Sequence, residues 1–424
     1  MSGFVPEQIE WWLIDLGPGR SAPGFWRSTL DSTRPRPAGF PRDGGSGSDA
    51  LDAFRSAMRE DVSTLTALAD PAVERRTARE LGAALLPKDL LDQLVSAQKR
   101  GATPILRIHA TGRVADVPWE TLAVDDRDTR LVEVAQVRMI PPPTDPSPAV
   151  GPVSGDRSCV VVDPRLGTSG ASGDLAAVVD RDDVPTPLAA MLARHGRVPG
   201  STVYGPGRSV GRERLRTALL DRPARLVYFG HVTSTETGDP ALDSIHLSDD
   251  VGIAGHAPAI PGHRPLSALD LMVGPPGVQT PMPYWPMPPR VALIGCGSGR
   301  EQRHREPFGL VSAAFATGAQ LVTATRWPLL TDFGLEPLTG PGIFPTSRLL
   351  AAVDAAHAAP DPFAALCGWK RGELAAWRAH RVTPTSLAGS AHSPLIWGAL
   401  ADFEDPAGGT HPWPETPRAR DSRH

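Results

Sequence analysis

The stretches RLVYFGHV (225–232) and RVALIGC (290–296) decide the fold of this chain. Each contains four consecutive apolar residues, and each ends with a reactive side chain, His231 in the first stretch and Cys296 in the second. Short continuous apolar runs of this kind are typical of strands that are buried on both faces of a sheet.

Two further runs predict strands of the same kind, SCVVVD (158–163) and AQLVTATRW (319–327). Helical patterns between and after these strands predict helices over 174–195, 208–220, 307–317, 346–359 and 362–380. Strands that alternate with helices favour a mostly parallel central sheet with helices on both faces. We therefore predict an α/β fold, specifically a three-layer α/β/α sandwich.

The first third of the chain has a different character. Trp11, Trp12 and Trp26 precede the run PRPAGFPRDGGSGSD (35–49), which has the composition of a flexible linker. Periodicity then predicts two helical segments and two strands. The helical segments are 49–70 and 72–98, and the strands are 103–110 and 131–139.

Composition excludes several classes of protein. The 424 residues carry a formal net charge of −4, which gives no basic surface for nucleic acid or an anionic membrane. No secretory signal begins the sequence, and no stretch approaches 18 consecutive apolar residues. Cys159, Cys296 and Cys367 are an odd set without paired spacing, which argues against a disulfide framework or a zinc site. We expect a cytoplasmic protein without metal or cofactor, whose thiols stay reduced.

The chemistry is predicted at the ends of the first two stretches. The carboxyl ends of parallel strands lie at one edge of a sheet, and neighbouring strands are about 5 Å apart. His231 is then placed to take the proton of the Cys296 thiol. The backbone N–H groups of Val232 and Gly297 are the predicted oxyanion donors. The alternative is that both residues belong to the core, because cysteine is among the most buried residue types.

An ordered set of segments resembles the CHAT family, a caspase-like branch of cysteine peptidases related to separase. The matching segments are GRVADVPWETL (112–122), LVYFGHV (226–232), HLSDD (246–250), VALIGCGSGR (291–300), REPFGLVSAAFATGAQLVTATRWPLLTD (305–332) and HSPLIWGALADF (392–403). The resemblance implies a caspase-like fold with a His231–Cys296 dyad. The chain departs from the family at Val232, where glycine is usual, and at Gly297-Ser298-Gly299, where an acidic residue, Thr and Gly are usual.

The predicted domain organisation follows from these patterns. It consists of a tryptophan-containing segment with a flexible linker (1–50), a helical connector (51–74), a CHAT-like peptidase domain (75–405) and a disordered tail (406–424). Within the peptidase domain we expect a first lobe (75–140) and a catalytic sandwich (150–405).

The resemblance implies a thiol endopeptidase that acts on protein or peptide substrates. CHAT proteins are often associated with sensor and effector proteins in bacterial conflict systems, so we expect a regulatory protein partner and weak basal activity. The segment 1–50 is the predicted docking element. Two alternatives stay open: a regulatory or scaffold protein with little turnover, and an acyltransferase that uses the same dyad.

Four other residues have predicted roles. Some basic-specific relatives have Asp two residues before the cysteine, where this chain has Ile294, so Asp163 is the remaining candidate for binding a substrate Arg or Lys. The competing interpretation is that Asp163, which precedes Pro164, only opens a loop. Trp119 and Trp327 are predicted to be structural, and Glu306 is predicted to serve the N-terminus of the following helix.

Overall fold

The architecture comes from a computed structural model of the chain. It describes residues 8–13, 24–28, 36–38, 46–59, 69–141, 156–166, 175–234, 238–280, 283–295, 309–382 and 387–405. The predicted positions Cys296, Gly297 and Glu306 lie outside these ranges, as does the tail 406–424.

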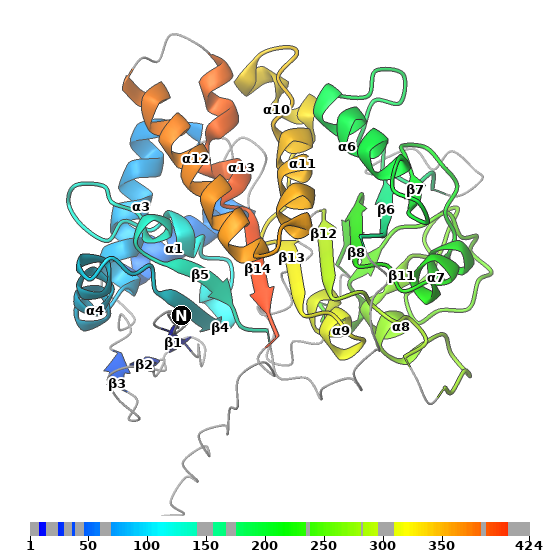
Figure 1. The fold of residues 1–424 in the computed structure, drawn as a ribbon, viewed down its shortest axis with the longest axis horizontal. Coiled ribbons are helices and arrows are strands. Elements are labelled where there is room, and N and C mark those ends of the chain that lie inside the picture. The colour runs from blue at the N-terminus through cyan, green and yellow to red at the C-terminus, as the bar shows by residue number, and fades with distance from the viewer. Residues whose placement is uncertain are drawn as a thin grey trace, which may run out of the picture.

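One sheet of eleven strands runs through the described residues (Figure 1). In spatial order the strands are β3 (Arg36–Ala38), β2 (Gly24–Ser28), β1 (Gln8–Leu13), β4 (Ile105–Ala110), β5 (Gln136–Met139), β14 (Leu400–Glu404), β13 (Leu321–Thr325), β12 (Arg290–Ile294), β8 (Arg225–Phe229), β6 (Ser158–Val162) and β7 (Thr202–Tyr204). Neighbours are parallel except in the pairs β1–β2, β2–β3 and β13–β14. Two parallel blocks of opposite direction therefore meet where β13 pairs with β14.

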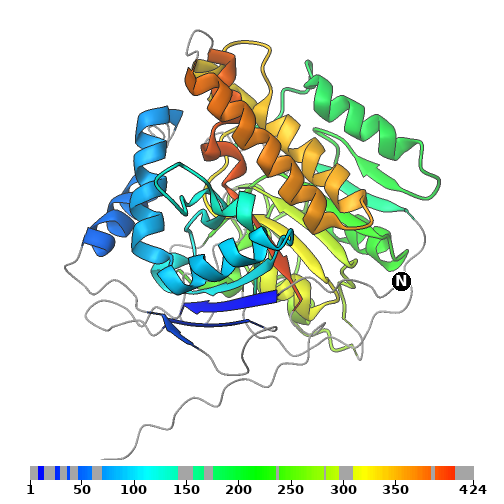
Figure 2. The same cartoon turned by 60° about the vertical axis from the view of Figure 1, so that its left-hand side comes forward.

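Alternate residues of the central strands face opposite sides of the sheet. In β8, Leu226 and Tyr228 join the apolar cluster on one face, and Val227 and Phe229 join the cluster on the other. The first face is covered by α7 (Arg212–Leu220), α8 (Ala268–Val273) and α9 (Leu310–Ala316). The second is covered by α6 (Thr186–Gly196), α10 (Asp332–Thr339), α11 (Pro345–Ala358) and α12 (Pro362–Val382) (Figure 2). The predicted three-layer α/β/α sandwich with a mostly parallel sheet is confirmed.

The structure differs from the sequence prediction at the N-terminus. Strand β1 adds to the main sheet in parallel with β4, and β3 lies inside the predicted linker 35–49. Trp11 is fully buried, and its ring meets that of Trp119 edge to face at 5.1 Å. Burial of a large aromatic surface favours this pairing, and the Gly and Pro content of the segment gave no sign of it.

In the described residues, three helices lie between β3 and β4 in the chain. They are α1 (Ser46–Arg59), α3 (Pro71–Leu85) and α4 (Lys88–Lys99). The carboxylate of Asp70 accepts hydrogen bonds from the N–H groups of Ala72 and Val73, which starts α3. The helix predicted over 49–70 corresponds to α1, and the helix predicted over 72–98 divides into α3 and α4, with Pro87 directly before the second.

Two other predicted elements are shorter than expected. The strand predicted over 131–139 begins as a helical turn, α5 (Leu131–Val134), because the Glu133 carboxylate accepts the Arg130 N–H at 2.8 Å and closes the turn. The helix predicted over 174–195 begins only at Thr186, just after Pro185. Upstream of it, Asp180 accepts the N–H groups of Asp182 and Asp183, a turn that competes with helix.

A second, smaller sheet grows from the stretch predicted as a single strand over 225–232. Strand β8 ends at Phe229, and the chain then forms β9 (Val232–Thr233). This strand pairs antiparallel with β10 (Ser244–Ile245), which pairs with β11 (Leu266–Ser267). Gly230 separates the two sheets, so His231 lies at the junction between them.

Candidate active site at the carboxyl edge of the sheet

Strands β8 and β12 are parallel neighbours, as predicted. Ile294 lies opposite Phe229, and both strands run toward the same edge. His231 follows Phe229 by two residues, and Cys296 follows Ile294 by the same two residues. The described part of β12 therefore stops just short of Cys296, at the level where β8 stops short of His231.

Glycines let the two strand ends approach closely. A Cβ atom on Gly295 would lie 2.6 Å from the Gly230 carbonyl oxygen and 2.7 Å from Cγ2 of Val232. The Gly230 N–H donates to the Ile294 carbonyl at 3.2 Å, and the Thr325 hydroxyl donates to the Gly295 carbonyl. The backbone immediately before Cys296 is thus held from both neighbouring strands.

The imidazole of His231 has a defined orientation. Its Nε2 donates to the carbonyl oxygen of Ala176 at 2.7 Å. A carbonyl can only accept, so this contact selects the tautomer with the proton on Nε2 and leaves Nδ1 as the basic nitrogen. Ala176 belongs to the loop that follows β6, and nothing in its side chain could have marked it in the sequence.

The backbone of His231 is held by the small sheet and by Tyr228. The His246 N–H donates to the His231 carbonyl at 3.3 Å. The Tyr228 hydroxyl lies 2.8 Å from the carbonyl oxygen of His231 and 3.0 Å from that of His246. Because His231 and His246 form a hydrogen-bonded pair, the next pair, Val232 with Ile245, is of the other type. The Val232 N–H therefore points away from β10.

Two buried histidines lie behind His231. His246 and His263 contact each other through Nδ1 and Nε2 at 2.8 Å, and Nε2 of His246 contacts the Thr233 hydroxyl at 2.9 Å. The rings of His231 and His246 are 6.2 Å apart. Burial, together with the neighbouring histidines, lowers the pKa of His246 to about 3, and burial also lowers the pKa of His263. Both rings are therefore neutral at neutral pH and position the backbone without adding charge.

Asp163 lies at the end of β6, beside β8. Its side chain is buried, and its backbone φ of +42° is rare for a residue other than glycine. The carboxylate accepts the N–H groups of Val178 and Val179 at 3.3 and 3.4 Å and lies 4.0 Å from the Arg181 guanidinium. Burial raises the pKa of this carboxyl, against the opposing effects of the Val178 N–H and the Arg181 charge. Among the described residues, the hydrogen bonds and the ion pair of this carboxylate are with its own loop.

The other two cysteines are unsuited to nucleophilic chemistry. Cys159 is fully buried in β6, and burial raises its pKa to about 12. Cys367 is buried in α12, and burial raises its pKa as well. Since the thiolate is the reactive form, neither thiol is suited to act as a nucleophile, and both side chains are part of the core. In the ranges described there is also no group of three or more His, Cys, Asp or Glu side chains able to hold a metal ion.

Comparison with protein families identifies the chain. The model of the CHAT domain matches residues 75–334, more than half of the sequence. The chain belongs to the CHAT domain family. The match spans the strand that leads to His231, the strand that leads to Cys296 and the Pro118-Trp119-Glu120 segment.

Comparison with solved structures found distant matches. Two are crystal structures of the Saccharomyces cerevisiae separase–securin complex, each 10% identical in sequence, with TM-scores of 0.34 and 0.33. Each alignment covers 86% of this chain, and it covers 22% of the first separase chain and 23% of the second. This CHAT protein thus spans less than a quarter of those chains. Comparison with curated protein sequences gave no match.

The Pro-Trp-Glu segment of this CHAT domain is structural. Trp119 is fully buried against Trp11, and Glu120 accepts a hydrogen bond from Nζ of the buried Lys370 at 2.7 Å. Lys370 also binds Asp402 of β14 at 2.7 Å, and Arg326 lies 3.0 Å from Glu120. The segment therefore ties the first lobe to α12 and β14 and to Arg326, which directly follows β13.

Trp327 lies near the C-terminal end of the residues that the CHAT domain model matches. It is 1% exposed and donates from Nε1 to the Leu395 carbonyl at 3.1 Å. Its ring meets Phe54 of α1 edge to face at 6.3 Å. Both predicted structural tryptophans are therefore core residues in the structure.

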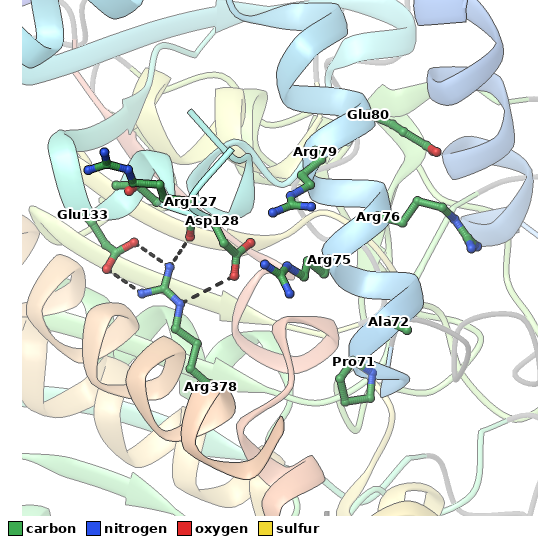
Figure 3. A pocket seen from close by; sticks show the side chains of 11 residues that line it. Pro71, Ala72, Arg75, Arg76, Arg79, Glu80, Arg127, Asp128, Glu133 and Arg378 are labelled. Carbon is green, nitrogen blue, oxygen red and sulfur yellow. Dashed lines mark hydrogen bonds and ion pairs between the residues drawn. The ribbon is translucent and has the colours of Figure 1, made fainter. Parts of the chain in front are cut away.

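A cavity of about 990 Å³ lies away from the catalytic edge, in the first lobe (Figure 3). Arg75 and Arg79 of α3 and Arg378 of α12 point into it, with Asp128 between them. Glu133 binds both terminal nitrogens of Arg378 at 2.7 and 2.8 Å. The ion pairs that line this cavity join α12 to the first lobe. The cavity lies apart from the ends of β6, β8 and β12.

Proposed function

We propose that this CHAT protein is a caspase-like cysteine endopeptidase in which Cys296 is the nucleophile and His231 is the general base. One observation carries the proposal. Two adjacent parallel strands, aligned in register, lead to these two residues. The Ala176 carbonyl accepts a hydrogen bond from the His231 imidazole and so orients it. A nucleophile, a base and a group that orients the base are the parts that such catalysis needs.

The reaction would proceed through a thioester. Nδ1 of His231 takes the proton of the Cys296 thiol, and the sulfur attacks the carbonyl carbon of the scissile peptide bond. When the tetrahedral intermediate collapses, the C–N bond breaks and the imidazolium returns the proton to the leaving amine. Water, deprotonated by His231, then attacks the thioester, which releases the carboxylic acid and restores the thiol.

We propose the Val232 N–H as one donor to the oxyanion, with the Gly297 N–H as a second. The pairing of Val232 with Ile245 directs the Val232 N–H away from β10 and leaves it available at the edge. Valine has the same backbone N–H as glycine, but its side chain narrows the space beside Gly295, where a Cβ atom would lie 2.7 Å from Cγ2 of Val232. We expect removal of one oxyanion donor to lower kcat about 100- to 1000-fold.

The test is covalent labelling by a peptide that carries an electrophilic ketone. We expect the wild type to be labelled at Cys296, and both Cys296→Ala and His231→Ala to lose labelling. Cys367→Ala is the matched control and should label like the wild type, because that thiol is buried and its pKa is raised. Equal labelling of the wild type and Cys296→Ala would instead support the catalytically inactive regulatory protein.

We further propose that a separate protein partner releases the activity, in the reducing cytosol and against one or a few protein targets, in a bacterial conflict or defence system. CHAT membership supports this proposal. Turnover of a peptide library by the purified chain should be weak and Cys296-dependent. Strong, promiscuous turnover without a partner would remove the partner-gating part.

A further inference from the structure

We infer that Asp163 is a positioning residue, whose carboxylate holds the loop that presents the Ala176 carbonyl to His231. The inference rests on the proposed function of His231 as the base. Asp163 would act through the loop rather than on the substrate.

The backbone of Asp163 is tied to two neighbouring segments. Its N–H donates to the Phe229 carbonyl at 2.7 Å, and its carbonyl accepts the Gly207 N–H at 2.8 Å. The first bond joins the end of β6 to the end of β8, two residues before His231. Asp163 also keeps a left-handed φ of +42°, a conformation that persists only where the surroundings enforce it. The backbone from which the Asp163 side chain extends is therefore held in a defined position near His231.

The carboxylate reaches the part of the loop next to Ala176. Its two oxygens accept the N–H groups of Val178 and Val179 at 3.3 and 3.4 Å. The Val178 N–H belongs to the peptide unit that follows the one containing the Ala176 carbonyl. A continuous path of contacts thus runs from Asp163 through the loop backbone to Nε2 of His231.

The same contacts argue against a substrate role for the carboxylate. Asp163 is 2% exposed, and Arg181 of its own chain already supplies a positive charge at 4.0 Å. Arg181 packs closely against Gly207, where a Cβ atom would lie 2.8 Å from Cδ of the arginine. A substrate Arg or Lys would have to displace both the loop and Arg181, so the predicted basic pocket becomes the rival hypothesis in the test.

The test variants are Asp163→Asn and Asp163→Gly, because Asn and Gly both tolerate a positive φ. The first replaces one acceptor oxygen by an N–H donor, and the second removes the carboxylate. The matched control is Asp180→Asn. Asp180 accepts the N–H groups of Asp182 and Asp183 in the same loop, and it is exposed.

Two measurements do not depend on activity. Amide hydrogen exchange at Val178 and Val179 should become faster in both Asp163 variants and stay unchanged in Asp180→Asn. Long-range proton–nitrogen NMR, with the His231 signals assigned by their loss in His231→Gln, should show the Nε2-protonated tautomer in the wild type and its loss in Asp163→Gly. Unchanged exchange and an unchanged tautomer in Asp163→Gly would overturn the inference.

Kinetics then separates positioning from substrate binding. A positioning role predicts that kcat falls by up to about 100-fold, while KM and the residue preference before the cut stay as in the wild type. Loss of a preference for basic residues, with normal exchange at Val178 and Val179, would make Asp163 a pocket residue. If the wild type were inert to the electrophilic peptide, the proposed function would fail, and the imidazole spectrum would still decide whether Asp163 holds His231.

Discussion

Tyr228 connects the candidate base to the small sheet through one hydroxyl group. It lies within hydrogen-bond distance of two carbonyl oxygens and of the His246 N–H. We expect Tyr228→Phe to lower the free energy of unfolding by about 1–3 kcal/mol, because buried backbone groups lose a partner. Labelling of Cys296 should slow as well. Tyr204→Phe, in the edge strand β7, is the control for urea unfolding and labelling, and it should change neither.

The buried His246 makes stability depend on pH. Its pKa is about 3 in the folded protein against an ordinary 6.5. As pH falls below 6.5 the unfolded chain binds a proton that the folded protein does not, so stability decreases toward acid. The slope is up to about 1.4 kcal/mol per pH unit for one such group. His246→Asn should reduce this slope in urea unfolding between pH 7 and 4. An identical slope in the variant would show that His246 does not titrate in this way.

Residues whose proposed chemistry resides in the side chain could be selected from the sequence. His231 and Cys296 could be chosen because a nucleophile and a base at strand ends form a recognisable pattern. Ala176 could not, since its contribution is a carbonyl group that every residue has. Asp163 was predicted as a site residue, but the contacts that suggest its role depend on a loop whose course the sequence does not reveal.

At the scale of elements, a buried ion cluster links the first lobe to α12 and β14. It consists of Glu120, Arg326, Lys370 and Asp402. Burial and the charges of Asp402 and Glu120 act on Lys370 in opposite directions, and the net effect raises its pKa; the pKa of Asp402 is lowered. Lys370→Met would leave both carboxylates buried without that cation. We expect a loss of about 3–5 kcal/mol in the free energy of unfolding.

The exposed Lys88–Asp92 pair in α4 offers a matched control for Lys370→Met. Its side chains are 88% and 66% exposed, so solvent screens the pair, and Lys88→Met should lower the free energy of unfolding far less than Lys370→Met. Urea unfolding of the two variants at neutral pH gives the comparison. Similar losses in both would mean that the buried cluster contributes no more than a surface pair.

Element boundaries were predicted less well than element types. The runs at 158–163 and 290–296 became β6 and β12 because continuous apolar sequence leaves few alternatives. The run 225–232 splits at Gly230, since the chain turns there from the main sheet into the small one. That change of direction depends on pairing with β10, which lies further along the chain. Local periodicity carries no information about such a partner.

At the scale of the whole molecule, strand order is the feature that the sequence could not supply. Strand β14, close to the C-terminal end of the described residues, inserts between β5 and β13. Strand β1, from the N-terminal segment, extends the block of β4 and β5. Both pairings join segments that are far apart in the chain. Only packing of the complete apolar surface selects them.

The position of β1 leads to a prediction about the N-terminal segment. Trp11 is fully buried against Trp119, so Trp11→Ala should cost about 3–5 kcal/mol of unfolding free energy, as truncation of a core tryptophan does. Deletion of 406–424, which the sequence predicts to be disordered, is the comparison and should leave the urea midpoint unchanged. If the segment 1–50 were instead only a docking element for a partner, Trp11→Ala would leave the midpoint unchanged and impair activation alone. A large loss of stability in the absence of a partner would show that this segment is an integral part of the sheet that carries the candidate site.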